Sequence, residues 1–197
     1  MKNGLPAWLK LALIALTAGL LLGFTNELTA PAIQAQTEMQ AEEARKAVLP
    51  VAETFELLDV PADAGVDYCY EGKRGGETAG YVAQTTTKGY GGEIEVIVGI
   101  GADGAITGIR VGGPNFSETM GLGAKTRDAE FTDQFQGQKG PISVGGKSDS
   151  VTSASANAEN PSESGGHVDA VTSATISSRA VVSAVNTACS YVQGLLG

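Results

Sequence analysis

The sequence predicts an α+β fold, in which a single transmembrane helix and a helical stalk precede a domain with an antiparallel sheet flanked by helices. Three observations support this prediction. An uncharged apolar run lies near the start of the chain, the middle holds a segment with alternating apolar residues that leads into a tight turn, and the last part carries an apolar stripe with helical spacing.

The N-terminal apolar run is long enough to cross a bilayer. Residues 11–24 carry no charge, and a span of about 5–26, with Lys10 reaching toward the headgroups, has close to the ~20 residues that a membrane requires. A cleaved signal peptide is the alternative, because Ala30-Pro31-Ala32 resembles a signal peptidase site.

The charges around this run predict its orientation. Lys2 and Lys10 precede or open the span, whereas Glu27 follows it. The positive-inside rule therefore places the N-terminus in the cytoplasm and the rest of the chain on the other side of the membrane.

The predicted domain organisation has three parts. Residues 1–33 hold the transmembrane helix, residues 34–50 form a charged helical stalk, and residues 51–197 form an extracytoplasmic domain. Within this domain, residues 137–166 are rich in glycine, serine and asparagine, and we interpret them as a flexible insert of low complexity.

An alternating segment followed by a tight turn predicts a β-hairpin in the middle of the chain. The first segment alternates in the manner of a strand with one buried face, through Ile94, Val96, Val98 and Ile100. Asp103-Gly104 supplies the backbone angles of a tight turn before a second strand that runs through Val111. Residues 99–104 also fit G-x-G-x-x-G, but they join strand to strand instead of opening a helix, so they predict no nicotinamide site.

The last part of the chain predicts an amphipathic helix. Apolar residues recur there at steps of three and four, at Val181, Val185, Ala188 or Cys189, Val192 and Leu195. Ser177 and Ser178 are candidate N-caps, because a serine oxygen accepts hydrogen bonds from the free amides of a first helical turn.

Hydroxyl groups gather just before this helix, on Thr172, Ser173 and Thr175. A helix N-terminus carries partial positive charge and unpaired N–H donors, which suit a phosphate group, and the small Ser173 and Ala174 let such a group approach closely. An ordinary capped helix is the alternative interpretation of the same residues.

Residues 169–178, DAVTSATISS, resemble the D-x-x-[ST]-G-A-T-x-[ST]-S signature of the FMN-binding domain in the G subunit of Rnf-type electron-transport complexes (RnfG). The related C subunit of the sodium-pumping NADH:quinone reductase (NqrC) has the same signature. In that family the last threonine of the core carries FMN through a phosphoester bond, so the resemblance implies covalent FMN on Thr175. Ser173 stands at the family's glycine position, where a positive φ would put steric strain on serine.

A second copy of this string lies twenty residues upstream. Residues 145–155, GGKSDSVTSAS, align with residues 165–175, GGHVDAVTSAT. Ser155 replaces the threonine, and residues 156–161 lack a helical stripe. The first copy therefore lacks the helix that a phosphate site needs.

Three further segments resemble the same family. Residues 89–113 resemble its glycine turn and hairpin, and the anchor followed by residues 26–33 resembles its N-terminal segment, which favours a retained anchor. Residues 118–123, ETMGLG, resemble an E-T-P-G-L-G loop near the flavin, with Met120 at the proline position. The resemblance implies that this loop and the threonine signature contact the cofactor, through Glu118, Thr119, Gly121, Leu122, Gly123, Thr172, Ser173, Ala174, Thr175, Ser177 and Ser178.

Composition and rare residues exclude other classes. A net charge of −9 argues against a nucleic-acid partner. His167 is the only histidine, which leaves no triad or metal site, so we predict neither a catalytic residue nor a metal ligand. Cys69 and Cys189 could pair outside the cell, but two unpaired thiols are favoured because Cys189 lies on or beside the apolar stripe.

The resemblance implies an electron-carrying subunit of a membrane-bound, ion-translocating complex of the ferredoxin:NAD oxidoreductase type, with no catalysis by this subunit alone. It also implies three partners: the other membrane and peripheral subunits, the lipid bilayer, and a flavin transferase that uses FAD and a divalent metal ion. A threonine hydroxyl without a base is a weak nucleophile, which is why a transferase is expected. The alternatives are a C subunit of the quinone-reductase type, and an anchored extracytoplasmic binding or scaffold domain without covalent flavin.

Overall fold

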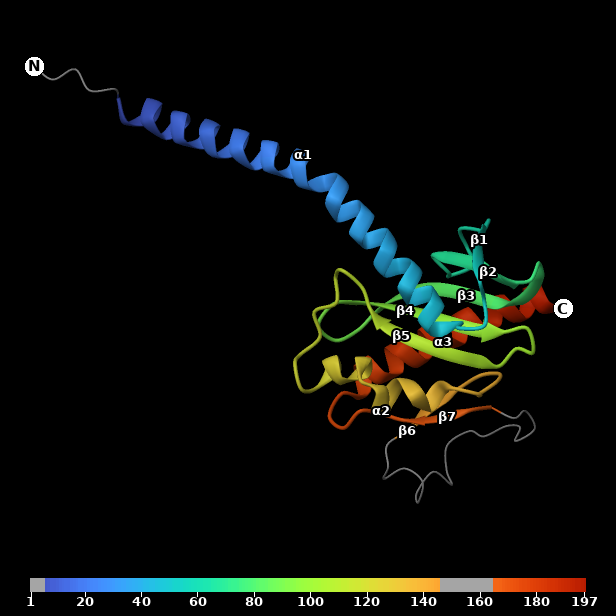
Figure 1. Cartoon of the computed structure of the whole chain (residues 1–197). Coiled ribbons are helices and arrows are strands. Elements are labelled where there is room, and N and C mark those ends of the chain that lie inside the picture. The colour runs from blue at the N-terminus through green and yellow to red at the C-terminus, as the bar shows by residue number, and fades with distance from the viewer. Residues whose placement is uncertain (1–5, 146–164) are drawn as a thin grey trace, which may run out of the picture. The chain divides into compact units, whose positions relative to one another are not determined.

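The structure is a computed structural model that describes residues 6–145 and 165–197 (Figure 1). It divides into two compact units, one up to Glu43 and one from Ala44 to Gly197. The strands are β1 (Thr54–Leu58), β2 (Tyr68–Arg74), β3 (Glu77–Lys88), β4 (Glu93–Gly101), β5 (Ile106–Gly112), β6 (Ser143–Gly145) and β7 (His167–Asp169). The helices are α1 (Ala7–Val48), α2 (Ala129–Thr132) and α3 (Thr175–Leu196), with the short 3-10 helices η1 (Gly123–Arg127) and η2 (Asp133–Phe135).

The described part of the first unit is α1 up to Glu43, which contains most of the predicted transmembrane span. Its apolar window is unburied, and among the described residues this helix is the only one long and apolar enough to cross a membrane. The helix continues through Pro31, whose ring nitrogen has no hydrogen to donate, and through the predicted stalk as far as Val48. The stalk is therefore part of the same helix and forms no separate element.

The end of α1 belongs to the second unit, so the compact domain begins before residue 51. Val48 and Leu49 are buried with Val82 in a small core on one face of the sheet. The Thr107 hydroxyl donates a hydrogen bond to the carbonyl oxygen of Val48, which gives one of the free carbonyls at the helix end a partner. The Arg45 guanidinium also lies 4.4 Å from the centre of the Tyr70 ring.

Five antiparallel strands form the main sheet, in the order β1-β2-β3-β4-β5. The predicted hairpin is confirmed as β4 and β5, and Gly104 in its turn has a φ of 78°. The predicted alternation is also confirmed, because the apolar residues at 94, 96, 98 and 100 are buried in the core that includes α3. Ile97, between them, packs against the small core at the end of α1.

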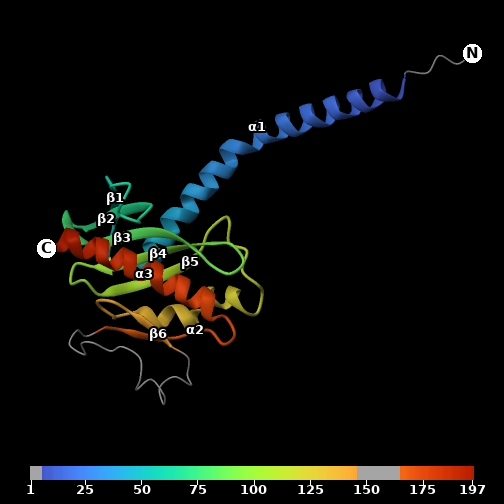
Figure 2. The same ribbon diagram turned by 180° about the vertical axis from the view of Figure 1, so that it is seen from behind.

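Helix α3 packs against β3 and β4 along one face of the sheet, as the views from both sides show (Figures 1 and 2). The predicted stripe is buried at Val181, Val185, Ala188, Cys189 and Val192. The prediction is wrong for Leu195, which is 40% exposed because it lies in the last turn at the end of the chain.

The first part of the predicted insert forms hydrogen-bonded structure. Ile106 in β5 donates its N–H to the carbonyl of Gln138 (2.9 Å) and accepts a hydrogen bond from the N–H of Gly137 (2.8 Å). Ile142 is buried, and β6 pairs in parallel with β7. The glycine-rich composition did not predict this structure, because backbone hydrogen bonds hold it together and composition does not report such bonds. Residues 146–164, which include Ser155, lie outside the described residues.

The two cysteines are unpaired and buried, which confirms the favoured prediction. Burial removes water from each thiolate and raises the pKa of Cys69 and of Cys189 from 9.0 to about 11. A pKa that is higher in the folded than in the unfolded chain stabilises the fold below pH 9, and this contribution is lost as the pH rises toward 11.

We therefore expect both thiols to resist an aromatic disulfide reagent at about pH 8 in the folded protein and to react fully in denaturant, as absorbance of the released thiolate measures. Ser190→Cys is the matched control, since residue 190 is exposed on α3 beside Cys189. That variant should label rapidly at one thiol. Equally rapid labelling of two thiols in the folded wild-type protein would contradict the buried placement.

Candidate functional site

The site is built around the turn that leads from β7 into α3. The N–H of Ala174 donates to the carbonyl of Val171 (2.9 Å), and Ser173, inside this turn, has a φ of 63°. Among the described residues, Ser173 is the only non-glycine residue with a positive φ. The strain expected from serine at the family's glycine position is thus present in the backbone.

The prediction that Ser177 and Ser178 cap the helix is wrong. The helix begins at Thr175 with Ala174 as its N-cap residue, and no side-chain hydrogen bond caps this end in the described chain. The left-handed turn at Ser173 starts the helix earlier than the serines suggest. The amides of the first turn are therefore not occupied by a capping side chain, and they suit an anionic ligand.

Both serines have other partners inside the first turns of α3. The Ser178 hydroxyl accepts a hydrogen bond from the N–H of Val171 (3.0 Å) and donates to the carbonyl of Ala174 (3.0 Å), which closes the turn. The Ser177 hydroxyl donates to Oε2 of Glu118 (2.7 Å). Ser178 thus maintains the turn, and Ser177 connects the helix to the ETMGLG loop.

Glu118 joins three segments that are far apart in the sequence. Its side chain is buried, with the residue 6% exposed, and its Oε1 accepts a hydrogen bond from the N–H of Gly91 (2.9 Å). The neighbouring Ser117 hydroxyl donates to the carbonyl of Gly91 (2.9 Å). The turn at residues 89–92, the ETMGLG loop and the start of α3 therefore meet at one carboxylate.

The glycines of these segments leave room for that carboxylate. A Cβ atom at Gly89 would lie 2.3 Å from Oε1 of Glu118, and one at Gly123 would lie 2.1 Å from Oε2. A Cβ atom at Gly91 would lie 2.4 Å from the carbonyl oxygen of Ser117. No real Cβ atom makes such contacts, so the close approach of the three segments requires glycine at these positions.

A cavity of about 450 Å³ opens where the three segments meet. Eight of the eleven predicted site residues line it, namely Glu118, Thr119, Leu122, Gly123, Ser173, Ala174, Thr175 and Ser177. Thr172, Gly121 and Ser178 do not line it. Tyr90 and Ile176 also line it but are not among the predicted residues. Both lie inside segments that resemble the family, residues 89–113 and 169–178.

The lining of this cavity fits FMN. Thr175 and the free first-turn amides of α3 offer a hydroxyl and N–H donors to a phosphate, while Tyr90, Leu122 and Ile176 offer exposed apolar surface to a flat ring. The volume lies within the ~300–1,000 Å³ of small-molecule sites. Met120, 86% exposed, lies outside the lining.

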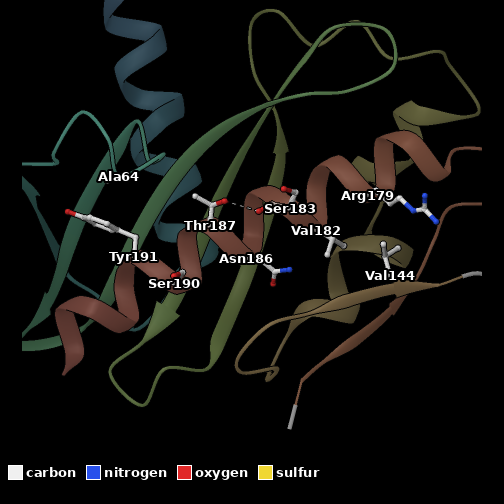
Figure 3. A pocket seen from close by; sticks show the side chains of 9 residues that line it. All are labelled: Ala64, Val144, Arg179, Val182, Ser183, Asn186, Thr187, Ser190 and Tyr191. Carbon is white, nitrogen blue, oxygen red and sulfur yellow. Dashed lines mark hydrogen bonds between the residues drawn. The ribbon is translucent and has the colours of Figure 1, made fainter. Parts of the chain in front are cut away.

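Another cavity, of about 660 Å³, lies along α3 (Figure 3). Its lining consists of Ala64, Val144, Arg179, Val182, Ser183, Asn186, Thr187, Ser190 and Tyr191. Asn186 is already used structurally, because its side chain donates to the carbonyl of Ile142 (2.8 Å) and accepts from the N–H of the same residue (2.7 Å). This lining contains none of the predicted site residues.

Comparison with known proteins shows the family of this chain. A family model described as FMN-binding domain matches residues 89–190. The G subunit of the sodium-translocating ferredoxin:NAD oxidoreductase complex of Acetobacterium woodii is 35% identical, over 94% of this chain and 89% of that protein. This chain belongs to the G subunit family of Rnf-type complexes. Its relatives include the G subunit of the ion-translocating oxidoreductase complex of Methanosarcina acetivorans, 35% identical over 95% of this chain and 93% of that protein.

A solved structure shows the same fold as this member of the G subunit family. The C subunit of the sodium-translocating NADH-quinone reductase from Parabacteroides distasonis superimposes with a TM-score of 0.56, at 16% identity, over 82% of this chain and 96% of that chain. The likeness confirms the predicted α+β fold with its antiparallel sheet.

Ser173 offers a test of the strained turn. We expect Ser173→Gly to raise the free energy of unfolding by about 0.5–1 kcal/mol, because glycine adopts a positive φ at little steric cost but loses more entropy on folding. Urea denaturation would measure the change. Ser183→Gly, at an exposed position inside α3, should instead lower stability by about 0.5 kcal/mol. Equal losses in both variants would show that Ser173 is not strained.

Proposed function

We propose that this chain is the flavin-carrying subunit of an ion-translocating electron-transport complex, and that its FMN is bound to Thr175 through a phosphoester bond. The observation that carries the proposal is the position of Thr175. It is the first residue of α3, its side chain is exposed, and it lines the cavity formed by the two motifs of the family. The curated relatives are subunits of ion-translocating oxidoreductase complexes.

The attachment reaction needs a second protein. The hydroxyl oxygen of Thr175 forms a bond to the phosphorus in the FMN half of FAD, the bond between the two phosphates breaks, and AMP leaves. The hydroxyl proton needs a base, and the structure shows no acidic side chain in a hydrogen bond with Thr175 among the described residues. A flavin transferase that brings FAD, a divalent metal ion and a base supplies these requirements.

The residues of the cavity have separate roles in this proposal. The amides in the first turn of α3 hold the phosphate, and the apolar side chains of Tyr90, Leu122 and Ile176 exclude water from the ring. Glu118 maintains the wall by joining its three segments. A bound flavin supplies the redox chemistry, and the protein determines the position and the surroundings of the ring.

The anchor determines where this carrier works. We propose that α1 is retained and crosses the membrane once, with the N-terminus in the cytoplasm and the FMN domain outside. A covalent bond would be useful there, because a dissociated cofactor would be lost by dilution. Other membrane and peripheral subunits of the complex would then donate and accept the electrons.

The test of the proposal is the chemical bond itself. The full-length chain is produced with a flavin transferase, denatured, and separated on a gel that is viewed under ultraviolet light. We expect a fluorescent band at the mass of the chain, because denaturation releases every flavin that is not covalently bound. A dark band from protein made with an active transferase would contradict the proposal and favour the binding or scaffold alternative.

Orientation has its own test. We expect protease added to sealed right-side-out vesicles to degrade the domain, leaving the anchor segment protected, as antibodies against tags at the two ends would show on a gel. Inside-out vesicles are the control and should protect the domain. Protection of the domain in right-side-out vesicles would contradict the outward placement.

A further inference from the structure

Glu118 is an anionic side chain in the wall of the first cavity, and neutral groups hold it there. Its carboxylate accepts two hydrogen bonds, one from the N–H of Gly91 and one from the hydroxyl of Ser177, and both donors are uncharged. Among the residues that the structure describes, no lysine, arginine or histidine forms an ion pair with it. Its charge is therefore held in place without being neutralised.

Burial makes this charge effective at the cavity. Water and salt screen exposed charges strongly, whereas a buried charge acts on its neighbours through a medium of lower effective dielectric constant. Glu118 is 6% exposed and lines the same cavity as Thr175. The close approach of Gly89 and Gly123 to its two oxygens also fixes the position of the carboxylate in the wall.

We propose that Glu118 lowers the reduction potential of the flavin bound in this cavity. Each electron that enters the ring adds negative charge, and a fixed negative charge in the wall opposes this addition. In this proposal Glu118 lowers the reduction potential of the flavin and also connects the three segments. The inference rests on the proposed placement of the flavin ring in this cavity, but it does not require the bond to Thr175.

Two variants separate the charge from the structural contacts. In Glu118→Gln, the amide oxygen can accept from Gly91 and the amide nitrogen can donate to the oxygen of Ser177, so the joint is retained while the charge is lost. In Ser177→Ala, the charge is retained while one hydrogen-bond donor to it is lost. Alanine is also a good residue for this helical position.

The experiment is an anaerobic redox titration, in which dithionite donates electrons to the flavin in the presence of a reference dye. We expect Glu118→Gln to shift the midpoint potential in the positive direction and Ser177→Ala to shift it in the negative direction. Glu93→Gln is the matched control, because Glu93 lies two residues from Gly91 but is exposed. Its shift should be much smaller because solvent screens its charge.

Shifts of the same sign in the first two variants would indicate a merely structural effect and would overturn the inference. Equal midpoint potentials in Glu118→Gln and Glu93→Gln would also overturn the inference. If Glu118→Gln does not retain flavin, an unchanged or raised potential in Ser177→Ala overturns it equally.

In-gel fluorescence of the same preparations answers the separate question of the covalent bond. Protein without that bond is reconstituted with free FMN before titration. Failure of the attachment proposal is therefore distinguishable from failure of the charge effect.

Discussion

Replacing Thr175 by valine is expected to reduce covalent flavin to the background of the gel assay. Valine has the β-branched shape of threonine but no hydroxyl oxygen, so no phosphoester bond can form at residue 175. The helix should remain folded, because the Thr175 side chain is exposed and Ala174 is the N-cap residue. Fluorescence per mole of chain, normalised to protein stain, measures the effect.

Two variants with other hydroxyls removed are the controls. Thr172→Val removes a hydroxyl that is close in sequence but does not line the cavity, and Ser155→Ala removes the corresponding hydroxyl of the upstream copy. Both should retain most of the wild-type signal. Persistence of the signal in Thr175→Val, or its disappearance in Ser155→Ala, would show that the attachment residue is a different one.

Replacing Gly123 by alanine is expected to lower the free energy of unfolding by about 1–3 kcal/mol. The added methyl group would lie 2.1 Å from Oε2 of Glu118 and 2.7 Å from Oγ of Ser177, so one of these groups must move. Movement of the carboxylate would leave the buried Ser177 hydroxyl or the Gly91 amide without its acceptor. Urea denaturation followed by circular dichroism measures the loss.

Gly194→Ala is the matched control for this substitution. Gly194 lies in α3, where an added methyl group would have nothing within 4 Å, so alanine should stabilise the helix by about 0.5–1 kcal/mol. The two variants are therefore expected to change stability in opposite directions. Unchanged stability in Gly123→Ala would mean that the loop adapts without disturbing Glu118. Gly123→Ala should also bind flavin more weakly, because the substitution moves the cavity wall.

Local patterns account for the parts of the fold that the sequence predicts well. The alternation over residues 94–100 and the Asp103-Gly104 turn depend on neighbours in the chain, so they are readable without a structure. The stripe from Val181 to Val192 is readable for the same reason, because one face of a helix repeats every three or four residues.

Other features depend on contacts between distant segments. The strand at Ser143–Gly145 depends on pairing with β7, and the buried end of α1 depends on the sheet beneath it. Capping preferences are local and favour the serines at 177 and 178 as caps, whereas their actual partners include Glu118, 59 residues from Ser177. Such pairings are decided by the fold and leave no periodic signal in the chain.

The sequence by itself determined the membrane anchor as a candidate, the α+β class, and Thr175 as the attachment residue to test, because these depend on apolar runs, periodicity and a family string. Only the tertiary structure showed that Ser173 has a positive φ and that Glu118 joins the 89–92 turn, its own loop and α3 around one cavity. The physical reason is that a charge, a cavity and a strained turn depend on which distant atoms come within a few ångströms of one another, and that distance is decided by packing.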